Sequence, residues 1–318
     1  MRRTLTQFLA VSLLSLGAAQ AAGTPPPPSS DWSTETVVVN APRHGPLFWH
    51  VSRGDAEVWI LGTVGPMPKG LAWDHTQLEQ ILDGAKSVLL QPRAQIGFFE
   101  ASWFLLTQRH TLELPNDAHL EDVLDPALKA RFVAARTSLH RDADHYEDYL
   151  PAVAGFMLFG DFLSDAKLSM SEPQDTIKDL ADHKDVPTHP IADYEAMPVV
   201  KEIGKMSDAA SRRCLSAALD DIAAEEAHQA LTAQAWAAGD LAGMRRNYSE
   251  ATIFDCLQQA PSFAQLWAQS VADATKVVDA ALAQGGKTLM VASLGALLRK
   301  DGILDRLRAE GATIDVPQ

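Results

Sequence analysis

The sequence predicts an α/β fold in which both ends of the chain form one mixed central sheet and a large helical insertion lies between them. Apolar runs typical of strands occur near both ends of the chain, whereas long Ala-rich stretches with helical spacing fill its middle. No internal repeat is present. We therefore expect one domain over residues 46–318, with the helical insertion at about 96–285.

The predicted domain opens with a hairpin. Apolar runs at 47–51 and 58–62 flank a turn that contains Gly54. A helix is expected over 73–85, and an apolar run at 87–90 stopped by Pro92 is typical of a buried parallel strand. Strand, helix and strand at this spacing predict a β-α-β unit.

The rest of the chain alternates between helical patterns and short strands. The tail returns to α/β, with strands at 288–292 and 313–316 around a helix at 300–310. In the middle a strand is expected near 188–191. Helices are expected over 98–109, 126–139, 146–164, 172–182, 199–218, 220–238, 241–258 and 261–284.

The N-terminus has the three parts of a secretory signal peptide, at residues 1–21. Arg2 and Arg3 precede a short apolar stretch, and Ala19-Gln20-Ala21 matches a cleavage site. Residues 22–45 contain four consecutive prolines and are expected to form a flexible or polyproline tether. The sequence thus predicts a periplasmic or secreted protein that does not insert into a membrane.

The chain is acidic, with 27 basic and 41 acidic residues. Removing Arg2 and Arg3 with the signal peptide leaves 25 basic residues, and 25 minus 41 gives a charge of −16. The electrostatic field of such a negative charge repels phosphate backbones and anionic lipids, so we expect no nucleic-acid partner and no binding to membrane surfaces.

Only two cysteines occur, Cys214 and Cys256. In an oxidising compartment two lone cysteines favour a disulfide, and closing this loop would stabilise the fold by roughly 4 kcal/mol. The alternative is a pair of buried thiols. Neither cysteine stands beside a His or a Gly-rich helix start, so a catalytic role is not indicated.

The expected ligand site lies beyond the carboxyl ends of the strands, as in other open α/β sheets. Three segments follow such ends: 62–70, 91–95 and 293–299. None of them contains a His, Asp, Glu or Cys. A hydrolytic metal site requires about three such ligands, so the sequence predicts neither a metal nor another cofactor.

The chain resembles the TraB/PrgY/GumN family, to which the Tiki proteases are related, over about residues 46–316. The resemblance rests on the opening strands with Gly62-Thr63, on a Trp-x-x-Gly-Asp step that begins at Trp236, and on Asp301-Gly302 near the end. In that family the first strand ends in Gly-Thr-x-His, a strand one helix later ends in Glu, and a second Gly-x-x-His precedes the last helix. The resemblance implies metallohydrolase activity at these positions.

In this chain the three implied metal ligands are missing. Gly65 stands at the first His, Gln91 at the Glu and Ala296 at the second His, with Ser293 at the glycine of that motif. The degenerate positions that the resemblance places in the cleft are Gly62, Thr63, Gly65, Gln91, Ser293, Gly295 and Ala296. A slip of the register by two residues, which would put Leu298 at the second His, supplies no ligand either.

Two other groups of polar residues are candidates for a re-sited centre. Asp193 and Glu195 follow the strand expected at 188–191, although structural or capping roles are the simpler interpretation. A cluster of His and carboxylate residues lies between His140 and Asp148, where we expect a solvated loop and helix start.

The segment with Phe98, Phe99, Trp103 and Phe104 is more apolar than one helix face requires. Two interpretations are open: the side chains belong to the core, or they line a cleft or a homodimer contact.

The function expected from these observations is that of a non-catalytic family member with a binding or scaffolding role toward an unidentified protein or peptide partner. The alternative is a hydrolase or peptidase of this family with a re-sited active centre. The first interpretation requires only the three losses seen in the sequence, whereas the second requires a new set of catalytic residues.

Overall fold

The computed structural model describes residues 45–248, 252–258, 260–315 and 317. The expected signal peptide and the tether up to residue 44 lie outside the described residues. Among those described, no helix is both long enough and apolar enough to span a membrane.

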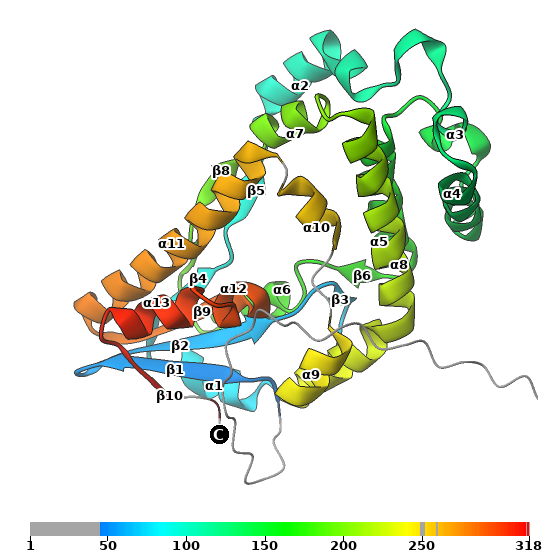
Figure 1. The fold of residues 1–318 in the computed structure, drawn as a ribbon. Helices are drawn as coiled ribbons and strands as arrows, with labels where there is room; N and C mark the ends of the chain where they lie inside the picture. Colours follow the sequence, from blue (N-terminus) through cyan, green and yellow to red (C-terminus); the bar gives the residue numbers. More distant parts are fainter. Residues whose placement is uncertain (1–44, 249–251, 259, 316, 318) are drawn as a thin grey trace, which may run out of the picture.

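The central sheet is mixed and has six strands in the order β10-β1-β2-β9-β4-β7 (Figure 1). The pairs β10–β1 and β1–β2 are antiparallel, whereas β2, β9, β4 and β7 run parallel. This confirms the predicted fold class, because strands from both ends of the chain share the sheet. The strands are β1 (Phe48–Arg53), β2 (Ala56–Thr63), β4 (Ala85–Leu90), β7 (Thr188–Pro190), β9 (Gly286–Ser293) and β10 (Thr313–Asp315).

The predicted hairpin and β-α-β unit are both present. Gly54 has a positive φ of 60° in the turn between β1 and β2, a conformation that favours glycine. Helix α1 (Thr76–Leu82) connects β2 to β4, and β9 from the end of the chain lies between these two strands in the sheet. Val58, Ile60 and Leu289 are fully buried, because both faces of these parallel strands are covered.

The helical insertion rises from the carboxyl ends of the parallel strands, with α8 on one side and α11 sloping back to the sheet on the other (Figure 1). Its second hydrophobic core lies between α5 and α8 and includes Leu158 and Leu215. The helices are α2 (Phe98–Thr107), α3 (Leu120–Val123), α4 (Pro126–Ser138), α5 (Pro151–Asp165), α6 (Gln174–His183), α7 (Met197–Ile203), α8 (Asp208–Ala237), α9 (Leu241–Asn247), α10 (Thr252–Leu257) and α11 (Pro261–Gln284).

Four predicted helix boundaries are wrong. The helix expected over 199–218 is divided, because α7 ends at Ile203 and α8 begins at Asp208, where the Ser207 side chain caps it. The break expected at 218–220 is absent, and α8 continues through it because Leu219 packs into the core between α5 and α8. The helix expected over 146–164 begins only at Pro151, a residue that favours the first helical position and is preceded by a short 3₁₀ turn. The helix expected over 241–258 is two helices: α9 ends at Asn247 and α10 begins at Thr252.

The Trp-x-x-Gly-Asp step ties the insertion to the sheet. Trp236, near the end of α8, is fully buried, and its Nε1 donates a hydrogen bond of 2.7 Å to the carbonyl of Gly62. Gly239 has a positive φ just after α8, and the Asp240 side chain accepts a hydrogen bond of 2.8 Å from the Gly243 amide at the start of α9. One short motif thus anchors α8, ends it and caps the next helix.

Candidate functional site

The carboxyl ends of β2, β9 and β4 meet at one edge of the sheet. Thr63, the last residue of β2, pairs in register with Ser293, the last residue of β9, and Gln91 directly follows β4. Ser293 also caps the next helix, α12 (Leu294–Leu298), through a hydrogen bond of 3.2 Å from the Ala296 amide to its hydroxyl. The register of the parallel strands therefore brings together Thr63, Gln91 and Ser293, which are distant in sequence.

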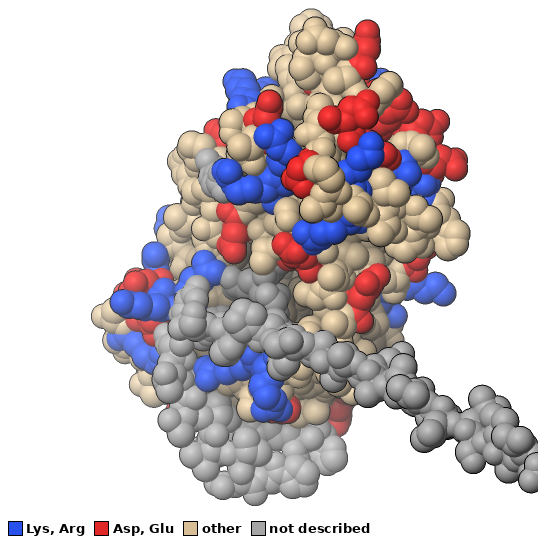
Figure 2. All heavy atoms as spheres, turned by 45° about the vertical axis from the view of Figure 1, so that its right-hand side comes forward, with Lys and Arg blue, Asp and Glu red and all other residues tan. Residues whose placement is uncertain are grey.

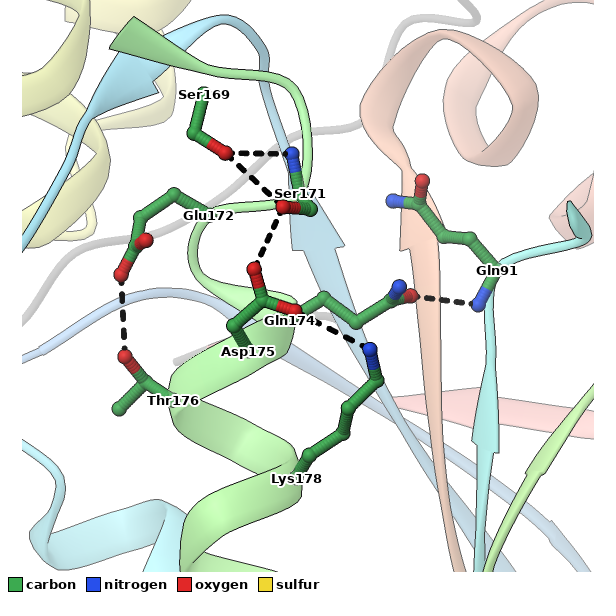
Figure 3. Close-up of polar contacts among 8 residues, drawn as sticks. All are labelled: Gln91, Ser169, Ser171, Glu172, Gln174, Asp175, Thr176 and Lys178. Carbon is green, nitrogen blue, oxygen red and sulfur yellow. Dashed lines mark hydrogen bonds and ion pairs between the residues drawn. The ribbon is translucent and has the colours of Figure 1, made fainter. Parts of the chain in front are cut away.

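A chain of neutral hydrogen bonds joins these three strand ends. The Gln91 side chain donates through Nε2 to Thr63 Oγ1 at 2.7 Å, and the Thr63 hydroxyl donates to the carbonyl of Ala292 at 3.2 Å. The backbone amide of Gln91 donates to Oε1 of Gln174 on α6 at 2.8 Å (Figure 3). No member of this network carries a charge.

A cavity of about 530 Å³ lies over this network. Five of the seven degenerate motif positions line it: Thr63, Gly65, Gln91, Ser293 and Ala296. The other two do not. Gly62 is packed under Leu294 and Trp49, and Gly295 is buried within α12.

Helices α7, α10 and α11 supply the other walls of the cavity, and sequence reasoning did not predict their part in it. Most of their side chains there are apolar or aromatic, and the rings of Phe254 and Phe263 stack at 6.3 Å. Their aromatic residues had no signal beyond helical spacing, which equally fits a core. The wall residues on these helices, or directly after α10, are Val199, Val200, Phe254, Asp255, Leu257, Gln258, Phe263, Leu266, Trp267, Ser270 and Ala274.

Few charged groups face the cavity. Among its described lining residues Arg299 is the only basic one and Asp255 the only acidic one. The Arg299 guanidinium lies 5.5 Å from the centre of the Trp267 ring, a cation–π contact. Tyr194 donates a hydrogen bond of 2.8 Å to Asp273, and burial together with this bond raises the pKa of the Tyr194 hydroxyl, which stays protonated.

Helix α10 is fixed against α8 at both ends. A disulfide joins Cys214 of α8 to Cys256 of α10, with the Cα atoms 5.4 Å apart, as the sequence predicts. At the other end, Asp221 of α8 accepts hydrogen bonds of 2.8 Å from the amides of Thr252 and Ile253, the first two residues of α10. Burial raises the pKa of this carboxyl, while these hydrogen bonds favour its charged form.

The residues at the positions where the resemblance implies metal ligands do not fit a metal ion. Glycine and alanine have no donor atom, and the Gln91 amide, a weak neutral ligand, already donates to Thr63. The described lining residues include no His or Cys and one carboxylate, Asp255. Among all the described residues, no group of three or more His, Cys, Asp or Glu side chains could hold a metal.

The candidate re-sited acids lie outside the cavity. Asp193 and Glu195 belong to β8 (Asp193–Glu195), which pairs with β5 (Arg93–Gln95), and only Tyr194 between them lines the cavity. Asp193 accepts a hydrogen bond of 2.8 Å from Arg93, whereas the Glu195 side chain is exposed.

The cluster between His140 and Asp148 also lies away from the cavity. Asp161 of α5 accepts hydrogen bonds from Arg141 at 2.9 Å and from Tyr146 at 2.6 Å, and His145 lies 3.2 Å from the same carboxylate. The hydrogen bond from Arg141 lowers the pKa of Asp161 below its usual range. This arrangement fastens the 3₁₀ turn to α5, which is a structural role.

A polar group at the start of α6 lies next in sequence to Met170, which lines the cavity. Ser171 donates to Asp175 at 2.6 Å, and Lys178 donates to the other oxygen of that carboxylate at 3.1 Å (Figure 3). The Ser171 hydroxyl and the Lys178 amine thus both donate to the Asp175 carboxylate. Between Ser169 and Ser171, Met170 extends to the cavity and packs beside Gly65.

Comparison with known proteins agrees with this architecture. The model of the TraB/PrgY/gumN family matches residues 47–316, which is nearly the whole described domain. No curated protein and no solved structure matches the chain. The chain therefore belongs to the TraB/PrgY/gumN family.

Proposed function

We propose that this protein is an exported, non-catalytic member of its family that binds a largely apolar ligand in the cavity at the strand ends. One observation carries the proposal: the positions at which the family resemblance implies metal ligands line a large cavity, and they carry Gly65, Gln91 and Ala296 instead. The proposed export rests on the signal-like N-terminus and is compatible with the disulfide.

The cavity has the size and chemistry of a small-molecule site. Its volume of about 530 Å³ falls within the range of ligand pockets. Burial of apolar ligand surface against Phe263, Trp267 and Leu266 would supply most of the binding energy, about 25 cal/mol for each Å² removed from water. The Gln91–Thr63 pair would hold a polar end of the ligand in place.

A hydrolase with a re-sited centre was the alternative expected from the sequence. Asp193 is held by Arg93, and the His140–Asp148 cluster serves Asp161, so neither group faces the cavity. We therefore advance no second function.

The experiment that tests the proposal is titration with N-phenyl-1-naphthylamine, an uncharged apolar dye. We expect saturable binding to one site with roughly micromolar affinity. The variant Ser270→Phe fills the cavity from α11 and should weaken binding at least about tenfold. The matched control is Ala268→Phe, an exposed position on the same helix that does not line the cavity, and it should bind like wild type.

Two results would contradict the proposal. Absence of saturable dye binding, or equal binding by both phenylalanine variants, would remove the cavity as the site. Stoichiometric Mn, Co, Zn or Fe in protein purified without chelator, together with peptide or ester hydrolysis that a chelator abolishes, would show a metal-dependent enzyme.

A further inference from the structure

The outward face of α2 is the most exposed apolar surface among the described residues. Phe99 is 87% exposed, Leu106 82% and Phe98 77%. Phe99, Trp103 and Leu106 follow one another at helical spacing, and Phe98 and Leu105 form the adjoining stripe. Only Phe104 of this helix is buried. The usual amphipathic arrangement, with apolar side chains turned inward, is therefore reversed.

The polar groups of α2 do not make this face hydrophilic. The Ser102 hydroxyl donates to the carbonyl of Phe98 at 2.9 Å, and the Thr107 hydroxyl donates to that of Trp103 at 2.7 Å. Glu100, the only charged residue of the helix, forms an ion pair of 3.2 Å with Lys201 of α7. A contiguous apolar face of this kind marks a contact surface.

The area of the face matches what a stable dimer requires. The exposed fractions of its large apolar side chains correspond to roughly 700 Å² of accessible surface, since an aromatic side chain contributes about 150–250 Å². A standard interface buries about 800 Å² on each partner, and Trp and Phe are typical anchors at its centre. Because a two-fold contact uses the same patch on both copies, an uncharged helix face is self-complementary.

A bilayer is a poorer match to the same face. Helices that lie in membrane interfaces carry Lys and Arg on their polar side, and α2 contains neither. The chain has a net charge of −14, and basic and acidic side chains are interspersed over the described atoms of the face shown in Figure 2. Charge therefore supplies no attraction to anionic lipid.

We propose that the outward face of α2 is the contact through which two copies of this chain form a homodimer. The interface is centred on Phe99, Trp103 and Leu106. The two acidic copies repel one another at long range, and salt screens this repulsion beyond a Debye length of about 8 Å, so added salt strengthens the dimer.

Sedimentation velocity on the purified full chain over a range of concentrations tests the proposal. We expect twice the monomer mass and tighter association in higher salt. The variant Phe99→Asp/Leu106→Asp should weaken association by at least about a hundredfold, because it places like charges in the centre of the contact. Leu231→Asp on α8, which also replaces an exposed leucine, should leave the dimer unchanged.

Cysteine cross-linking tests the geometry separately from stability. Ser102→Cys, in the middle of the face, should give a covalent dimer under mild oxidation, and Ala230→Cys, exposed on α8, should not. A wild-type chain that stays monomeric, a dimer that survives the double Asp substitution, or flotation of the wild type with neutral phosphatidylcholine vesicles would each overturn the proposal. Circular dichroism of each variant verifies that it is folded.

Discussion

The side chain of Gln91 donates a hydrogen bond of 2.7 Å to the hydroxyl of Thr63 and thereby reaches across β9, which lies between their strands. Thr63 passes a bond on to Ala292 of β9 itself. The three strand ends at which the family resemblance implies metal ligands are thus connected by neutral groups of the protein. The network closes the floor of the cavity without a charge.

Replacing Thr63 by valine should destabilise the protein by about 1–3 kcal/mol, because Thr63 is buried and its hydroxyl both accepts from Gln91 and donates to Ala292. Denaturant unfolding measures the change. Thr63→Ser keeps the hydroxyl and serves as the control. A Thr63→Val variant as stable as wild type would show that these hydrogen bonds do not contribute to stability.

Restoring the missing ligands with Gly65→His, Gln91→Glu and Ala296→His should create a site that binds Zn²⁺, since the three positions line one cavity. A Cβ at Gly65 would lie 3.6 Å from Met170, an ordinary contact, so a side chain is tolerated there. Isothermal titration calorimetry measures the binding. In the control both histidines are replaced by phenylalanine. If the triple variant takes up no metal, the positions assigned from the resemblance are wrong.

Removing the disulfide with Cys214→Ser and Cys256→Ser should lower the free energy of unfolding by roughly 4 kcal/mol. Dye affinity should fall as well, because α10, which carries Phe254 and Leu257, would lose its covalent link to α8. Thermal unfolding and dye titration report the two effects. Reductant should reproduce both in wild type and change neither in the double variant; unchanged dye affinity would separate α10 from the binding site.

A methyl group at Gly62 should cost about 1–3 kcal/mol of stability, because it would overlap Leu294 and the ring of Trp49 at the point where Trp236 binds the Gly62 carbonyl. Gly160→Ala is the opposite case. That helical glycine is exposed with open space around it, so alanine should stabilise the protein by about 0.5–1 kcal/mol. Chemical denaturation measures the change in the free energy of unfolding of each variant. Changes of the same sign in the two variants would contradict the packing described.

Glu225 should make stability depend on pH. Burial, and secondly the charge of Asp221, raise the pKa of this carboxyl to about 8. The folded state therefore holds a proton that the unfolded chain has released above its ordinary pKa of 4.5. The destabilisation begins above pH 4.5, grows as the pH rises and levels off above about 8.

The variant Glu225→Gln should therefore be more stable than wild type at pH 8.5, with a difference that vanishes near pH 4. Urea unfolding at several pH values measures the difference. Glu226→Gln, an exposed neighbour on α8, should show no such trend. A constant offset for Glu225→Gln across the pH range would mean that its effect comes from packing and not from titration.

The sequence sufficed for those elements whose pattern is local. The strands β2, β4 and β9 follow from continuous apolar runs, and α11 from the proline at its start and its helical spacing. The strand-end segments 62–70, 91–95 and 293–299 were predicted as the ligand site, and residues from all three line the cavity. The assignment of that cavity as a functional site stays a prediction.

The remaining features depend on contacts between distant residues. Nothing local to 241–258 shows that α10 starts anew at Thr252, because the group that caps it, Asp221, lies on α8. Likewise, Phe254 of α10 and Trp267 of α11 have the spacing of core residues, and only the tertiary placement of these two helices makes them part of the cavity wall. Position 293 was assigned as a lost motif glycine, whereas its hydroxyl caps α12.

The bond between Cys214 and Cys256 also makes one wall of the cavity sensitive to the redox state of its surroundings. Helix α10 forms one wall of the cavity. In a reducing environment the chain would lack the disulfide that fixes this wall to α8. Ligand binding by the proposed site would then depend on oxidation of the two cysteines.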